Sequence, residues 1–270
     1  MRGIPDTVMV HVRRFGISGA LALGVIVLML AGINPISVLT GQFAGPPPLM
    51  ARTGIAAIEA GEATLEEFMT ALNRDADAYW TQAFWVSKLP YASPKFVAVA
   101  DSGELGCGMA GAAIGTFYCP LEATVYVDLS SYEQLRVAFP EVAAEAQAYR
   151  MGKAYGHHTQ NELDLLAPFE ATRAGMSAEA VLVLEQQFSA QAACYVAVWA
   201  GYARIGRLLD DPALVEAIDT VAELMPSQQA RHIPETFAPA GAAFRKEWFD
   251  NGWALPVGGT CKIGLIGPPY

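Results

Sequence analysis

Residues 144–160 read AEAQAYRMGKAYGHHTQ, and this stretch decides how the rest of the chain is interpreted. Helical sequence opens at Ser131-Tyr132-Glu133-Gln134, which has capping-box form, and continues through the stretch with a break at Pro140. Two adjacent histidines, His157 and His158, lie near its end. Neighbouring residues on a helix point about 100° apart, so these two side chains cannot share one site as residues four apart can.

The same helix has the spacing of a zinc-protease motif without most of its chemistry. In H-E-x-x-H, two histidines four residues apart bind Zn²⁺, and the glutamate beside the first is the general base. The corresponding positions here are Lys153, Ala154 and His157. An ammonium cannot ligate while it is protonated and repels a dication, and a methyl group is no base. These residues predict no catalytic side chain, no cofactor and no bound metal, with His157 as a weak remaining ligand candidate.

Two blocks of sequence resemble a known family. Gly156, His157, His158 and Gln160 match the pattern H-E-x-G-H-H-x-Q, and residues 189–200 resemble E-L-Q-A-D-C-[FY]-A-G-V-W-A. Both patterns are typical of the neutral zinc metallopeptidase family of bacteria, whose members are single-pass membrane proteins. The resemblance implies that the third zinc ligand comes from the first glutamate of the second block. Ser189 occupies that position in this chain.

Shorter matches follow the order of the family over most of the chain, so the chain is identified as a degenerate member that lacks the H-E-x-x-H motif. The resemblance implies an α+β fold with a zincin-like origin. The matching segments are Gly-Ile-Asn-Pro at 32–35, Tyr79-Trp80 to Phe84, Gly106-Cys107-Gly108, Phe117 to Pro120, Val125 to Leu129, Ile233 to Phe237 and Arg245 to Phe249.

The remaining pattern predicts a mainly helical domain with a small sheet. Thr64-Leu65-Glu66-Glu67 has capping-box form and opens a helix, in which Trp80 and Trp85 are interpreted as packing residues. Short strands are expected at 96–100 and 124–129. The longest helix is expected from an N-cap at Ser177 to about residue 209, and further helices at 211–224 and 240–251.

The N-terminal region is predicted to be a membrane anchor. Residues 15–33 carry no charged side chain, and the apolar run resumes after Asn34-Pro35 as far as Leu39, a length that just spans a bilayer. Arg2, Arg13 and Arg14 precede it, so the positive-inside rule puts the N-terminus in the cytoplasm. A cleavable signal peptide is the alternative, although the run exceeds a usual h-region and lacks a clear A-x-A site.

These features predict four regions in a single-pass protein of the bacterial inner membrane, with a periplasmic or extracellular domain. Pro46-Pro47-Pro48 fixes an extended backbone, so its segment is interpreted as a stiff spacer. The regions are a cytoplasmic N-terminus at 1–14, a transmembrane anchor at 15–39, a proline-rich linker at 40–60 and an exported metallopeptidase-like domain at 61–270.

Four cysteines follow the anchor, an even number in a compartment that permits disulfides. Cys107 and Cys119 are close in sequence and are predicted to pair, which leaves Cys194 with Cys261. The alternative, a thiol enzyme with Cys194 beside a histidine, finds little support in this pattern.

Charge argues against nucleic acid as a partner. Beyond residue 40 the chain carries 14 basic and 26 acidic side chains, so phosphate backbones and anionic lipid surfaces repel the domain. The expected partners are the bilayer, through the anchor, and proteins, including a larger membrane complex.

Two functions remain open at this stage. The first is a catalytically inactive homologue that acts as a membrane-anchored binding or structural protein, and the sequence favours it. The second is an active peptidase or hydrolase with an altered metal site, for which Glu162, Asp164 and Glu185 are substitute ligand candidates. Metal catalysis needs a fixed ion and a proton acceptor, and neighbours cannot easily replace two ligands and a base together.

Overall fold

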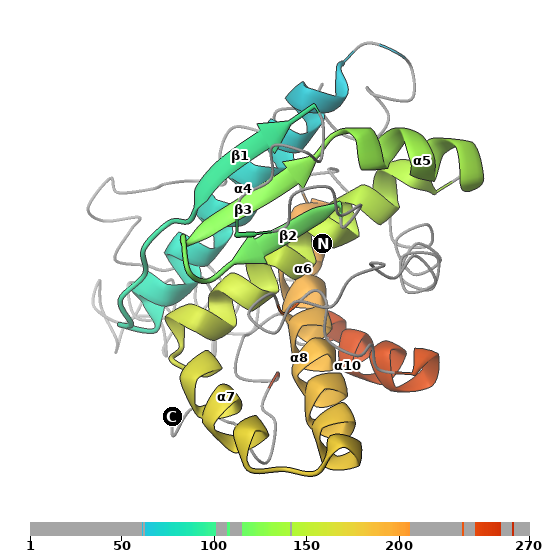
Figure 1. The fold of residues 1–270 in the computed structure, drawn as a ribbon. Helices are drawn as coiled ribbons and strands as arrows, with labels where there is room; N and C mark the ends of the chain where they lie inside the picture. Colours follow the sequence, from blue (N-terminus) through green and yellow to red (C-terminus); the bar gives the residue numbers. More distant parts are fainter. Residues whose placement is uncertain are drawn as a thin grey trace, which may run out of the picture. The chain divides into compact units, whose positions relative to one another are not determined.

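The structure is a computed structural model, and it describes residues 61, 63–100, 107–108, 115–140, 142–205, 234, 241–254 and 261. Within these residues the fold is mainly helical with one small sheet, as predicted (Figure 1). The elements are α4 Leu65–Val86, β1 Lys95–Val99, β2 Thr116–Cys119, β3 Thr124–Asp128, α5 Ser130–Ala138, α6 Ala143–Glu162, α7 Leu166–Ala174, α8 Ala178–Ile205 and α10 Ala242–Ala254.

Several helix ends lie where the sequence predicts them. The Thr64 side chain accepts from the Glu67 backbone and the Glu67 carboxylate accepts from the Thr64 backbone, which confirms the capping box of α4. The Ser177 hydroxyl accepts a hydrogen bond from the Ala180 N–H at 3.3 Å at the start of α8. The expected break at Pro140 separates α5 from α6. The predicted helix at 211–224 lies outside the described residues.

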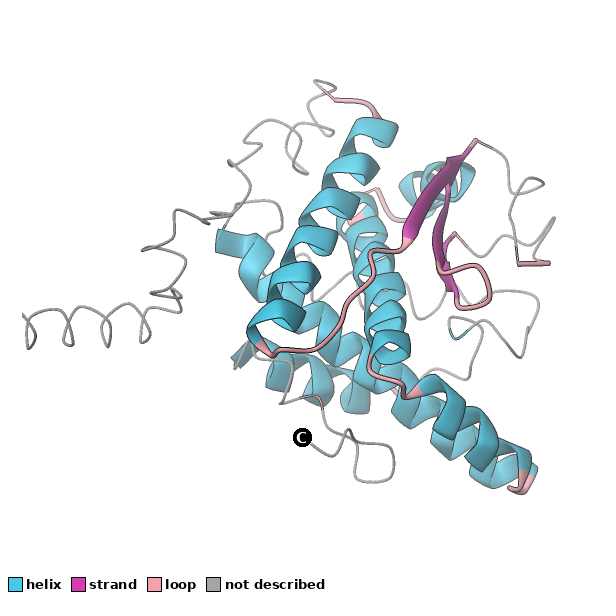
Figure 2. Cartoon of the chain, turned by 90° about the vertical axis from the view of Figure 1, so that its left-hand side faces the viewer, coloured by secondary structure: helices cyan, strands magenta, loops and turns pink. Residues whose placement is uncertain are grey.

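The sheet has the order β1-β3-β2, with β1 parallel and β2 antiparallel to β3. Alternate residues point to opposite faces. Tyr118, Val125 and Val127 face the main core, whereas Phe117 and Tyr126 belong to a second cluster with the Cys107–Cys119 disulfide. Figures 1 and 2 show α4 and α6 on one face of the sheet, which they cover.

Helix α6 is central to the described part of the molecule, because it contacts β2 and helices α4, α5, α7 and α8. It crosses α8 closely at Gly156, where an added Cβ would lie 2.7 Å from the Ala192 carbonyl oxygen. Real Cβ atoms do not approach a backbone oxygen so closely, so only glycine allows this crossing. The sequence therefore places glycine where the two helices must touch.

Three details differ from the sequence-based expectation. Strand β2 and helix α7 are not anticipated, and Trp85 is 56% exposed whereas Trp80 is 3% exposed. Trp80 and Phe84 lie on the buried face of α4. Trp85 follows Phe84 directly, so it is rotated about 100° away from that face. The packing interpretation is confirmed for Trp80 and wrong for Trp85.

The proposed anchor at 15–39 and linker at 40–60 lie outside the described residues, and the domain boundaries remain predictions. None of the helices in the described ranges is both long and apolar enough to cross a membrane.

Candidate functional site

Lys153, Ala154 and His157 lie in the middle of α6, and Ser189 lies on the neighbouring helix α8. Ala154 and His157 are buried, at 0% and 1% exposure, while Lys153 is half-buried. The His157 ring stacks on Phe188 at 6.0 Å between ring centroids, and Ser189 follows Phe188 directly. The structure thus puts His157 against the α8 turn that carries Ser189.

His157 is held by one hydrogen bond and has one unsatisfied ring nitrogen. Its Nδ1 lies 2.7 Å from the Gln160 Oε1, and its buried Nε2 has no hydrogen-bond partner among the described residues. Burial lowers the pKa of His157 well below its usual range, and the Lys153 charge lowers it further. The ring is therefore neutral at physiological pH.

His158 points about 100° away from His157 around α6. Its ring lies among three tyrosines, Tyr91, Tyr118 and Tyr155, and its Nε2 lies 2.9 Å from the Ala92 carbonyl oxygen. Burial lowers the pKa of His158 to about 4. A carbonyl oxygen can only accept, so Nε2 carries the proton, and His158 is a neutral packing residue.

The segment 87–94, pink in Figure 2, runs from the end of α4 to β1 and supplies that carbonyl group. The Ala92 N–H also donates to the Glu162 carboxylate at 2.9 Å. Tyr91 and Ser93 donate to the two oxygens of Asp77 on α4, at 3.1 and 3.0 Å. The segment is therefore fixed to both α4 and the C-terminal half of α6.

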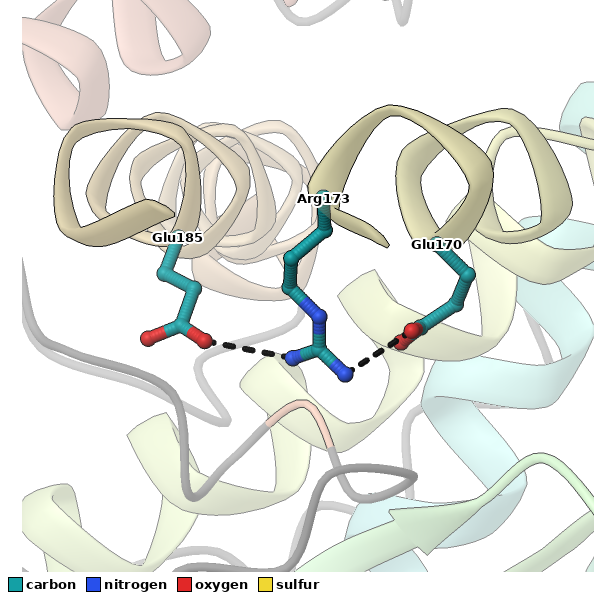
Figure 3. A network of polar contacts seen from close by, with 3 residues as sticks. All are labelled: Glu170, Arg173 and Glu185. Carbon is teal, nitrogen blue, oxygen red and sulfur yellow. Dashed lines mark hydrogen bonds and ion pairs between the residues drawn. The ribbon is translucent and has the colours of Figure 1, made fainter. Parts of the chain in front are cut away.

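The substitute ligand candidates form no group of three potential metal ligands with His157 among the described residues. Glu162 binds the 87–94 segment, and Asp164 lies in the turn after α6 with a φ of 55°. Glu185 pairs with Arg173 at 3.1 Å, and Arg173 also pairs with Glu170 at 2.8 Å (Figure 3). This ion-pair network joins α7 to α8 and packs Arg173 over the Phe169 ring.

The residues at the family's ligand positions do not fit a zinc ion held by three protein ligands. His157 offers one neutral nitrogen, whereas Lys153 offers a positive charge, Ala154 a methyl group and Ser189 a hydroxyl. Among the described residues, only Cys107, Cys119 and Glu122 bring three potential ligand atoms together, and the two sulfurs form a disulfide. Lys153, Ala154, His157 and Ser189 therefore do not provide the ligand set of a metal-dependent step.

Both predicted disulfides are confirmed. Cys107 is bonded to Cys119 and Cys194 to Cys261. A disulfide sulfur is no nucleophile, so the alternative of a catalytic Cys194 is wrong for this oxidised form. Cys194 lies on α8 and ties Cys261 to that helix.

One residue at the site escapes the sequence analysis. Gln191 is fully buried in the apolar part of α8, where its side chain hydrogen-bonds both Gln160 and the Cys261 carbonyl. A buried amide needs partners for its donors and its acceptor. The sequence signal that could have identified Gln191 is its position as a lone glutamine within the apolar run from Phe188 to Ala200.

Comparisons with known proteins agree with the sequence resemblance. The model of the family described as "Putative neutral zinc metallopeptidase" matches residues 6–262. The chain is 26% identical over 242 residues to the uncharacterized protein YpfJ of Escherichia coli K12, covering 87% of this chain and 83% of that protein. It is 29% identical over 188 residues to Mycobacterium tuberculosis Rv2575, covering 63% of this chain and 62% of that protein. No solved structure matches the chain.

The family match corrects one prediction. From Lys153, Ala154 and Ser189 we predicted that the chain is not an enzyme. The match extends over nearly the whole chain and points to an enzyme class, and no observation shows a loss of activity. That prediction reasoned from three side chains in the sequence alone and is wrong. Over residues 6–262 the chain belongs to the neutral zinc metallopeptidase family.

Proposed function

We propose that this chain is a membrane-anchored member of its family whose exported domain binds polypeptide at the Lys153–His157 site. The observation that carries the proposal is the neutral His157 ring, which lies one helical turn from the Lys153 ammonium and whose buried Nε2 has no partner within the part of the chain that the structure describes. The family description supplies the ligand class, because peptidases act on polypeptides.

A peptide group complements these two side chains. Every non-proline peptide unit presents one N–H donor and one carbonyl acceptor. The unsatisfied Nε2 accepts a hydrogen bond, and an ammonium donates to a carbonyl oxygen. A buried acceptor without a partner costs about 1–3 kcal/mol. A ligand N–H would recover this cost once the site opens enough to admit it, because His157 is 1% exposed. The residues thus suit a polypeptide better than they suit a dication.

The membrane location is part of the proposal. The charge-free run at 15–33, preceded by three arginines, supports an anchor with the N-terminus in the cytoplasm. The acidic composition beyond it supports protein partners rather than nucleic acid. A membrane complex would bring such a partner to the domain.

Binding is tested with the full-length protein in mild detergent and fluorescein-labelled casein, an unfolded polypeptide, as the probe. Fluorescence anisotropy should show saturable binding. A hydrogen bond to a charged group contributes about 1.5–3 kcal/mol, so Lys153→Met should weaken binding at least about tenfold. His157→Phe, which keeps a ring against Phe188, should also weaken it.

Lys246→Met is the matched control, because Lys246 lies on α10 with its side chain 60% exposed and pairs with Asp250. This variant should bind casein as the unchanged protein does. Absence of saturable binding, or equal effects of Lys153→Met and Lys246→Met, would contradict the proposal. The same samples on a gel report casein cleavage, so binding and hydrolysis are scored separately.

A further inference from the structure

A network of buried hydrogen bonds ends at His157 and begins at the carbonyl group of Cys261. The Gln191 Nε2 donates to the Cys261 oxygen at 2.7 Å. The Gln160 Nε2 donates to the Gln191 Oε1 at 2.8 Å and to the Phe188 carbonyl oxygen at 2.9 Å. The Gln160 Oε1 then lies 2.7 Å from the His157 Nδ1. We call these side chains and the Cys261 carbonyl the glutamine network.

The two backbone carbonyl groups decide which way each amide points. A carbonyl oxygen only accepts, so the Gln191 nitrogen must face Cys261 and the Gln160 nitrogen must face Phe188. The Gln160 oxygen is therefore the atom that faces His157. Because an amide oxygen also only accepts, the His157 Nδ1 must carry the proton.

This assignment fixes the other ring nitrogen. A neutral imidazole has one N–H and one lone pair, so His157 Nε2 is the acceptor. Gln160 and Gln191 are 0% exposed, and Cys261 and His157 are each 1% exposed, so water does not compete for these groups. The Cys194–Cys261 disulfide holds the Cys261 carbonyl beside Gln191, one turn along α8.

We propose that Gln160 and Gln191 are positioning residues that hold His157 as its Nδ1–H tautomer, with the disulfide-tethered Cys261 carbonyl as the fixed end of the network. The binding of a polypeptide to the His157 Nε2 rests on the proposed function, but the assignment of the tautomer does not. The network keeps Nε2 an acceptor whether or not a ligand is bound.

His158 provides a built-in control. Its Nε2 donates to the Ala92 carbonyl group, so His158 holds the opposite tautomer and is not part of the glutamine network. The full chain has four histidines, so a histidine-selective ¹⁵N spectrum is simple enough to assign by substitution. Long-range ¹H–¹⁵N correlations distinguish the Nδ1–H from the Nε2–H form.

In the full-length protein, His157 should be the Nδ1–H form and His158 the Nε2–H form, each with a preference above about tenfold. Gln160→Met removes the acceptor and should give both tautomers at His157. Gln191→Met should reduce the preference less, because the Phe188 carbonyl still orients Gln160. Gln147→Met, a buried glutamine on the same helix, should leave His157 unchanged.

Unchanged ¹H–¹⁵N correlations of His158 show that a variant is folded. A variant that unfolds would change the signals of both histidines. A His157 that is mainly Nε2–H in the unchanged protein would overturn the proposal. So would a Gln160→Met variant that keeps the Nδ1–H preference. Failure of casein binding with the expected tautomers would reject only the proposed function.

Discussion

His157 and His158 are adjacent on α6, yet the two faces of the helix hold them in opposite ways. On the α8 face, the Gln160 side chain holds the His157 Nδ1. Each ring has one buried nitrogen without a partner among the described residues, Nε2 in His157 and Nδ1 in His158. On the sheet face, the 87–94 segment and three tyrosines enclose His158. Each face also has its own disulfide, Cys194–Cys261 near α8 and Cys107–Cys119 at the sheet.

The difference teaches how a site can change while its scaffold persists. The scaffold residues Gly156, His158 and Gln160 make backbone or buried contacts that other side chains cannot reproduce. Lys153 and Ser189 occupy ligand positions of the family, where they offer an ammonium and a hydroxyl group. The contacts around α6 are therefore present although Lys153, Ala154 and Ser189 depart from the family pattern.

Removal of each disulfide should give the largest difference in stability between the two faces. Cys194–Cys261 closes a loop of 67 residues and Cys107–Cys119 one of 12. The loop-entropy relation predicts losses of about 4 and about 3 kcal/mol in the free energy of unfolding. Paired Cys→Ala variants measured by urea denaturation would show this. A greater loss in the free energy of unfolding without Cys107–Cys119 than without Cys194–Cys261 would contradict this prediction.

Acid should lower the free energy of unfolding through protonation of His158 on the sheet face. Its pKa is lowered to about 4 in the folded protein, so between that pH and about 6.5 the unfolded chain binds more protons. Stability should therefore fall as the pH drops from 7 to 4, by about 3 kcal/mol from this group.

The measurement is the free energy of unfolding of the unchanged protein and of His158→Phe at pH 7 and pH 4. The variant should lack the pH dependence of stability that His158 contributes to the unchanged protein. An identical slope in both proteins would show that His158 titrates normally.

Gly156→Ala should disturb the α8 face by a smaller amount. The added methyl group would meet the Ala192 carbonyl oxygen at 2.7 Å, so the helices must separate, at a cost of about 2 kcal/mol. Gly175→Ala is the control, because its nearest neighbour would be the Thr172 oxygen at 3.9 Å. Thermal unfolding of both variants would rank them, and equal midpoints would contradict the close crossing of α6 and α8.

Local signals in the sequence predicted much of the fold. The capping box at Thr64, the break at Pro140 and the two cysteine pairs are confirmed, because each depends on chemistry near in sequence or on pairing by elimination. Strand β2 has four residues, all buried, so no alternation marks it. A short, fully buried strand has no signature in one sequence.

The site was less predictable than the fold. The positions of Lys153, Ala154, His157 and Ser189 follow from the motif. The glutamine network does not, since it joins Gln160 to residues 28 and 31 positions away and Gln191 to one 70 positions away. Which amide meets which carbonyl group depends on how α6 crosses α8, and no spacing rule supplies that.

The central claim is that the family scaffold remains around α6 while Lys153, Ala154 and Ser189 do not fit its zinc ion. The direct test is zinc per chain, measured by mass spectrometry of metals in full-length protein equilibrated with equimolar zinc and then desalted. The unchanged protein should hold far less than one zinc. The variant Lys153→His with Ala154→Glu and Ser189→Glu should approach one zinc, because His157 already lies one turn from position 153. Stoichiometric zinc in the unchanged protein, lost in His157→Phe, would contradict the claim.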